Sequence, residues 1–175
     1  ETFNPTRELT HDDLLRTGEI TLRAIHTPGH VSNHFCFLLE EEATLFAGDH
    51  IMNGSTVVIV PPGGNMKAYI ESLRLLLEYP ARFIAPGHGE LMEDAVAVLE
   101  RLVEHRLQRE RKVIAGLRQL GRTTLDALVV AVYDDVHASV HRVARLSLHA
   151  HLIKLAQERR AVHRAADDTW QLGSG

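Results

Sequence analysis

Cysteine, aromatic residues and long apolar runs are all scarce in this 175-residue sequence, in which aromatics make up 5% of the chain. The single cysteine, Cys36, excludes an internal disulfide, and its apolar neighbours predict a buried structural thiol rather than a nucleophile. No run approaches the roughly 18 apolar residues that a membrane-spanning helix needs. Residues 1–10 are polar and do not resemble a signal peptide, so a reducing, cytoplasmic setting is expected.

Charge is divided unevenly along the chain, although the formal net charge is only −4. Residues 1–100 hold 6 Lys/Arg against 15 Asp/Glu, a balance of −9, and residues 101–175 hold 13 against 8, a balance of +5. Such a division indicates two modules with different surfaces, or solvated faces that simply differ. We place the expected modules at residues 1–104 and 105–175.

The first module has the pattern of a mixed α/β domain. Asn65 is a suitable N-cap for an amphipathic helix over residues 66–78. Short apolar or alternating runs bounded by turn residues predict strands. These runs are residues 21–25, 34–39, 44–47, 56–60 and 82–85.

The second module is mainly helical. Apolar periodicity predicts one helix from about Glu93 to Gly121, a short helix capped by Thr123 or Thr124, and a long helix opened by Ser139. Two strand-like runs, residues 161–164 and 169–172, form an expected hairpin at the end of the chain. Three helices followed by a hairpin are typical of a winged helix.

Histidine and aspartate recur in glycine-containing turns directly after the predicted strands. The three clusters are His26-Thr27-Pro28-Gly29-His30, Gly48-Asp49-His50 and Pro86-Gly87-His88-Gly89. A single histidine beside Pro-Gly is more often a turn residue than a ligand, but three clusters with one layout are hard to obtain by accident. Imidazole and carboxylate are ligands that zinc accepts. Asp49 is our choice for a residue that bridges two metals, because no other acid lies in a glycine turn immediately after an apolar strand.

These motifs resemble those of the metallo-β-lactamase-like hydrolases, in the order found in that superfamily. The matching residues are Thr27-Pro28-Gly29-His30, Gly48-Asp49-His50 and Gly87-His88-Gly89, and the resemblance covers residues 1 to about 100. It implies half of an αββα sandwich. The tail from about His105 to Leu172 resembles the winged-helix extension of one branch, whose members are reported as lactamase-like hydrolases and in one case as an endoribonuclease.

The resemblance also implies a two-metal site. His30 would bind one metal, Asp49 would bridge, and His88 would bind the other metal. Zinc is the expected metal, with iron and manganese as alternatives. Three further histidines are expected near the ligands: His26 supporting them, His34 lining the cleft, and His50 either orienting Asp49 or serving as a structural residue.

One motif of the superfamily, His-x-His-x-Asp-His, is missing from these 175 residues. The only His-x-His, His149-Ala150-His151, lies in a predicted helix, where residues two apart point to nearly opposite sides. The chain is therefore expected to be a C-terminal portion of a longer hydrolase and to be inactive alone. Strand faces with Phe35, Phe37, Leu45 and Val57 would then be exposed, which predicts a homo-oligomer or a missing N-terminal portion.

The expected substrate is an ester, thioester or lactone, or an RNA phosphodiester, and no membrane is involved. A different class of function stays open, namely a nucleic-acid-binding module or an endoribonuclease that uses the basic tail. Arg142, Arg145 and His149 recur at three- and four-residue spacing on the predicted long helix and could meet phosphates. They could equally form an ordinary solvated face, because Trp170 is the only aromatic residue nearby for stacking.

Overall fold

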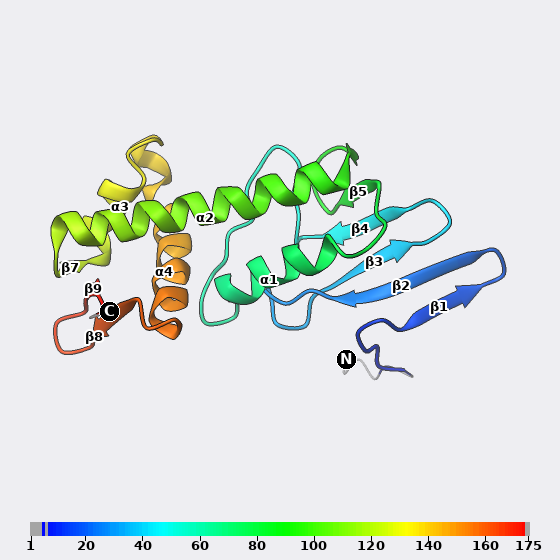
Figure 1. The fold of residues 1–175 in the computed structure, drawn as a ribbon, viewed down its shortest axis with the longest axis horizontal. Coiled ribbons are helices and arrows are strands. Elements are labelled where there is room, and N and C mark those ends of the chain that lie inside the picture. The colour runs from blue at the N-terminus through cyan, green and yellow to red at the C-terminus, as the bar shows by residue number, and fades with distance from the viewer. Residues whose placement is uncertain (1–4, 6, 174–175) are drawn as a thin grey trace.

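Six strands form the larger sheet in the same order in space as along the chain (Figure 1). The computed structural model describes residues 5 and 7–173. Strands β1 to β4 form an antiparallel meander, β4 and β5 are parallel, and β6 pairs antiparallel with β5. Their bounds are β1 Leu14–Thr17, β2 Ile20–His26, β3 Phe35–Leu39, β4 Thr44–Gly48, β5 Phe83–Pro86 and β6 Met92–Glu93. The predicted mixed α/β domain is confirmed.

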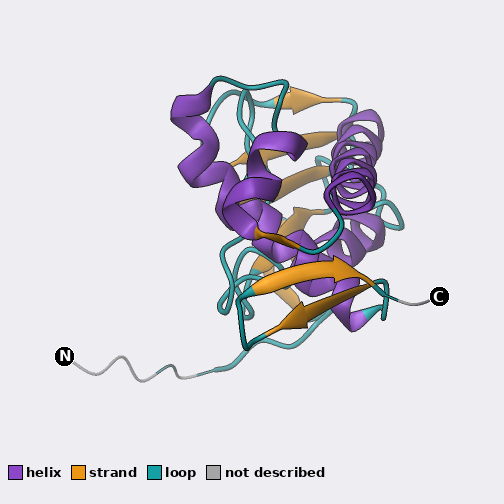
Figure 2. Cartoon of the chain, turned by 90° about the vertical axis from the view of Figure 1, so that its left-hand side faces the viewer, coloured by secondary structure: helices purple, strands orange, loops and turns teal. Residues whose placement is uncertain are grey.

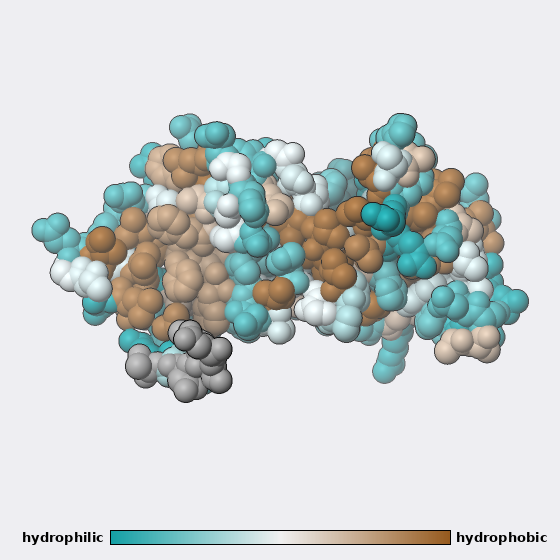
Figure 3. Space-filling model, turned by 180° about the vertical axis from the view of Figure 1, so that it is seen from behind, coloured by the Kyte–Doolittle hydropathy of each residue, from teal (hydrophilic) through white to brown (hydrophobic). Residues whose placement is uncertain are grey.

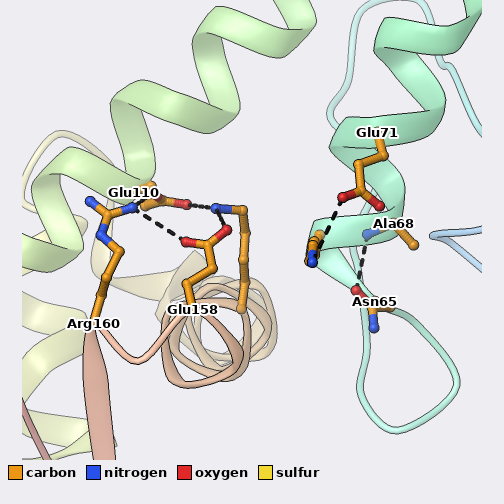
Figure 4. Close-up of polar contacts among 8 residues, drawn as sticks. Asn65, Ala68, Glu71, Glu110, Glu158 and Arg160 are labelled. Carbon is orange, nitrogen blue, oxygen red and sulfur yellow. Dashed lines mark hydrogen bonds and ion pairs between the residues drawn. The ribbon is translucent and has the colours of Figure 1, made fainter. Parts of the chain in front are cut away.

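Two helices, α1 (Met66–Leu76) and α2 (Ala95–Leu120), cover one face of this sheet (Figures 1 and 2). Alternate strand residues such as Cys36, Leu38 and Leu45 are buried against them, as the period of two in a strand requires. The predicted cap of α1 is also present, because the Asn65 side chain accepts a hydrogen bond from the Ala68 amide at 3.0 Å (Figure 4).

The opposite face of the sheet is open and partly apolar. Phe46 is 45% exposed there, and Phe35 and Phe37 are half-buried. Seen from behind, apolar side chains extend over the sheet half of the molecule (Figure 3). The expectation that Leu45 and Val57 would also be exposed is wrong: both are buried in the core beneath the helices.

Residues 56–60 were expected to form a strand, and this prediction is wrong. Among the described residues the segment pairs with no strand, and side chains bind two of its carbonyl groups instead. The Val57 carbonyl accepts a hydrogen bond from Arg106 Nη2 at 2.6 Å, and the Val58 carbonyl accepts one from His30 Nδ1 at 3.2 Å. Its buried apolar side chains, Val57 and Ile59, explain why the sequence looks like a strand.

The second module is a winged helix, as predicted. Helices α3 (Leu125–Val132) and α4 (His141–Gln157) pack against α2 and against a small sheet. This sheet has the order β7-β9-β8, with bounds β7 Thr123–Thr124, β8 Ala161–Arg164 and β9 Thr169–Leu172. Thr124 caps α3, and a 3₁₀ turn at Ala138–Val140 precedes α4 where Ser139 was expected to open the helix.

Helix α2 belongs to both modules. Its first turns, including Leu99, lie in the core of the larger sheet, whereas Val113 and Leu117 lie in the core of the winged helix. The helix continues without interruption through residues 104 and 105, where we expect the boundary between the modules. The position of that boundary stays a prediction. Neither α2 nor any other helix in the described part of the chain is both long and apolar enough to cross a membrane.

A buried ion-pair network joins α2 to α4 and to the turn that precedes β8 (Figure 4). The Glu110 carboxylate accepts from Lys154 Nζ at 2.6 Å and from Arg160 Nη1 at 2.8 Å, and Lys154 also contacts Glu158 at 2.8 Å. The side chains of Glu110 and Lys154 are 6% and 9% exposed. Without Glu110, the buried ammonium of Lys154 would keep only Glu158 as a partner and would be less fully compensated.

We therefore expect Glu110→Ala to lower the free energy of unfolding by up to about 3–5 kcal/mol, the usual cost of breaking a buried pair, because Glu158 still offsets part of the Lys154 charge. Urea unfolding followed by circular dichroism measures this loss. Glu104→Ala is the matched control on the same helix, because the Glu104–Arg111 pair is exposed and screened by solvent. Equal losses of stability in the two variants would contradict the assignment of Glu110 as the ionic link.

Candidate metal centre

The three histidine clusters lie at the same end of the larger sheet. Strand β2 is antiparallel to β3, and β3 is antiparallel to β4, so β2 and β4 point in one direction. Strand β5 is parallel to β4, with Pro86 opposite Gly48. The turns that follow β2, β4 and β5 therefore lie at one end of the sheet.

The turn after β2 is held in a compact shape. The Thr27 amide donates to the His34 carbonyl at 2.9 Å, which closes the loop at its base. Gly29 has a φ of +150°, and a Cβ at this position would lie 2.4 Å from the Cα of Tyr69. Only glycine allows this approach of the loop to α1, and the approach fixes the position of His30.

His30 is oriented by the backbone. Its Nδ1 lies 3.2 Å from the Val58 carbonyl, which can only accept, so Nδ1 carries the proton. Nε2 of the neutral ring then has a free lone pair. A histidine ligand is commonly held in this way by a backbone carbonyl on its second nitrogen.

His34 is oriented by a chain of three hydrogen bonds. The Cys36 thiol donates to the Ala47 carbonyl at 3.8 Å, and the Thr27 hydroxyl donates to Cys36 Sγ at 3.3 Å. Because the Thr27 hydroxyl proton is used in this way, its oxygen accepts from His34 Nδ1 at 2.9 Å. His34 therefore also presents an unprotonated Nε2, beside Gly48.

The electrostatic surroundings keep His34 neutral. Burial lowers the pKa of His34, the nearby His30 lowers it further, and Asp49 acts in the opposite direction.

Asp49 and His88 meet at the surface. His88 Nε2 lies 3.4 Å from Asp49 Oδ1, and both side chains are more than half exposed. The Gly87 amide donates to the Gly48 carbonyl at 2.8 Å and joins the two turns. A Cβ at Gly87 would lie 2.8 Å from Asp49 Oδ1, so glycine leaves this carboxylate room.

His50 and His26 lie behind the surface residues. His50 is fully buried between the rings of His34 and Tyr69, and burial lowers its pKa to about 3. Neither of its ring nitrogens has a hydrogen-bond partner within the described residues, Asp49 included. His26 Nε2 donates to the Ser32 carbonyl at 3.0 Å and braces the turn after β2.

The predicted ligands suit zinc or a related metal in kind, although not in number. His30, Asp49 and His88 offer two imidazoles and a carboxylate, and His30 has a free Nε2 lone pair. Within residues 5 and 7–173, however, no group of three or more His, Cys, Asp or Glu side chains is arranged to hold a metal ion. A two-metal centre would need more ligands than these three.

Sequence reasoning did not identify the residues that support the histidines. Thr27 lies inside the first of the three motifs, but nothing local indicates that its hydroxyl contacts Cys36 and His34. The basic face of α4 is also less free than expected, because Arg145 forms an ion pair with Asp126.

Two family profiles match the chain. One, described as "Metallo-beta-lactamase superfamily", matches residues 2–88, and the other, "Beta-lactamase associated winged helix domain", matches residues 124–170.

Relatives and solved structures agree with these matches. A lactamase-like protein of Emericella nidulans is 32% identical over 88% of this chain and 52% of its own length, and an atrochrysone carboxyl ACP thioesterase of Aspergillus chevalieri is 35% identical over 80% and 47%. A metallo-beta-lactamase family protein from Thermus thermophilus superposes with a TM-score of 0.79 at 26% identity, over 94% of this chain and 53% of that one. The chain thus spans about half the length of the curated relatives it matches.

We expect Thr27→Val to release His34 from its present tautomer. The variant removes the acceptor for His34 Nδ1, so protonation of Nε2 becomes competitive and stability falls by about 1–3 kcal/mol, the cost of an unpaired buried polar group. Long-range ¹H–¹⁵N correlation spectra of the histidine rings report the tautomer. Thr44→Val is the control, because Thr44 Oγ1 bonds only the Glu42 carbonyl. An unchanged His34 tautomer would contradict the assigned chain of hydrogen bonds.

Proposed function

This chain belongs to the metallo-β-lactamase superfamily, and on that premise we propose that it supplies part of a two-metal hydrolase centre. The observation that carries the proposal is the convergence of three turns, after β2, β4 and β5, at one end of the sheet. His30 follows β2, Asp49 follows β4 and His88 follows β5, and in this proposal the three side chains belong to one site.

In this proposal His30 binds one metal, Asp49 bridges the pair, and His88 binds the other. Zinc is the proposed metal, and iron or manganese are the alternatives that the same ligands would accept. When bound, such metals supply hydroxide at neutral pH and stabilise an oxyanion. The chain's own residues orient the imidazoles: the Val58 carbonyl holds His30, and Thr27 holds His34 next to the site.

Three side chains are too few to hold two metals, so we propose that the 175-residue chain is inactive alone. The open face of the sheet, with Phe35, Phe37 and Phe46, supports this proposal, because an apolar face of this kind is normally covered. In the working hydrolase it would be covered by another portion of the same protein or by a second copy.

Among the candidate substrates, a thioester is our first choice, ahead of an ester or lactone. One relative is named an atrochrysone carboxyl ACP thioesterase, which supports an acyl group carried on sulfur. An RNA phosphodiester is the less favoured substrate, because Arg145 on the basic face of α4 is already paired with Asp126.

Metal binding can be measured without any substrate. We expect zinc titrated into the chain to bind weakly, and His88→Ala and Asp49→Ala to weaken binding at least about tenfold by removing a ligand. Isothermal titration calorimetry gives the affinities, and elemental analysis of the purified chain gives the metal content. His163→Ala is the control, because His163 pairs with Asp168 in the winged helix. Equal zinc affinities in the wild-type chain and all three variants would contradict the assignment of His88 and Asp49 as metal ligands.

A hydrolysis assay tests separately whether the chain by itself forms a complete metal centre. We expect the zinc-loaded chain to hydrolyse an acyl thioester no faster than zinc in buffer, with release of the thiol followed by a thiol-reactive dye. Turnover that Asp49→Ala abolishes would overturn the proposed inactivity while supporting the assigned site. Turnover unaffected by Asp49→Ala would argue against both.

A further inference from the structure

An open cavity lies between the two modules. It has a volume of about 340 Å³ and is lined by residues 56–58, by α2, and by the loop before α4 together with the start of α4. The volume is at the lower end of the range for small-molecule pockets, about 300–1,000 Å³. The cavity is separate from the candidate metal centre, although both adjoin the same segment, because Val57 and Val58 line its wall.

Arg106 is the distinctive residue of this cavity. It is 3% exposed, and its guanidinium lies 5.0 Å from the ring centroid of Tyr69. One donor, Nη2, binds the Val57 carbonyl at 2.6 Å, but Nε is buried without an acceptor among the described residues. A buried polar group without a partner is uncommon because it is costly.

No carboxylate compensates the charge of Arg106 within the described part of the chain. Glu110 lies one turn further along α2, but Lys154 and Arg160 occupy it. Arg109, which also lines the cavity, has its own partner in Asp135 at 3.0 Å. The residues that line the cavity include no aspartate or glutamate.

The neighbouring histidines do not add charge. Burial lowers the pKa of His151 to about 3, with a further contribution from Arg106, and burial and Arg106 also lower the pKa of His105. Both rings are therefore neutral near pH 7. The cavity consequently carries one uncompensated positive charge.

The opening of the cavity is apolar. Val136, Val140 and Val143 line it, and they are 37%, 44% and 47% exposed. Three exposed valines beside a buried guanidinium form a surface with one charged end and one aliphatic end.

We infer that this cavity binds a small aliphatic carboxylic acid, with the carboxylate on Arg106 and the hydrocarbon chain against the valines. A single uncompensated charge suits a monoanion better than a phosphate dianion. The planar guanidinium also matches the planar carboxylate. The inference does not depend on the proposed hydrolase activity.

Calorimetric titration of the full chain with octanoate tests this inference. We expect saturable one-to-one binding of octanoate, with octanol and inorganic phosphate each at least tenfold weaker. If octanol binds as tightly as octanoate, the proposed role of Arg106 is wrong. Phosphate as tight as octanoate would overturn the choice of an aliphatic carboxylate, and the absence of binding at millimolar octanoate would overturn the site.

Variants at exposed positions avoid the risk of unfolding the core. We expect Val143→Asp to weaken octanoate binding at least tenfold, because it places a negative charge at the opening. Val130→Asp is the matched control: Val130 is 59% exposed on α3 and does not line the cavity. Equal weakening in the two variants would overturn the location of the site.

Arg106→Met tests the charge itself, with circular dichroism confirming the fold. If the variant is folded, octanoate should lose its advantage over octanol, whereas retained preference for octanoate would overturn the assignment. If the variant is unfolded, the comparison of Val143→Asp with Val130→Asp still decides the question.

Discussion

The structure depends on how one short segment, residues 56–58, is held. It pairs with no strand among the described residues, and the carbonyls of Val57 and Val58 bind side chains from different parts of the chain. Arg106 of α2 holds the Val57 carbonyl, and His30 binds the Val58 carbonyl. These bonds tie the candidate metal centre to α2. The position of His30 is therefore set by long-range contacts as much as by its own turn.

Helix α2 extends this constraint to the winged helix. A continuous helix of 26 residues whose side chains are buried in both cores leaves no flexible linker between the modules. The Glu110 network then links the C-terminal half of α2 to α4 and to the turn before β8. The cavity between the modules is thus bounded by elements that are fixed to one another, so a ligand would meet a preformed wall. Preformed sites require less ordering on binding.

Local sequence patterns predict correctly those elements that depend mainly on residues close together in the chain. The strand over residues 21–25, the cap at Asn65 and the C-terminal hairpin follow from alternation and turn residues. The strand expected at residues 56–60 fails because an apolar, β-branched run does not reveal whether a partner strand exists. Leu45 was expected to be exposed for a related reason: which face of the sheet the helices cover is a tertiary property.

The candidate site also has features that the local sequence predicts and features that depend on residues far apart in the chain. The sequence places His30, Asp49 and His88 after strands, and the topology alone brings them to one end of the sheet. The protonation of the rings cannot be read from the sequence, because it is set by partners distant along the chain. Cys36 illustrates this: it is buried, as predicted, and burial raises its pKa to about 12. Because the thiol keeps its proton, it donates to the Ala47 carbonyl and accepts from Thr27, which leaves the Thr27 oxygen to accept from His34. A residue with no catalytic role thereby determines which nitrogen of His34 faces the site.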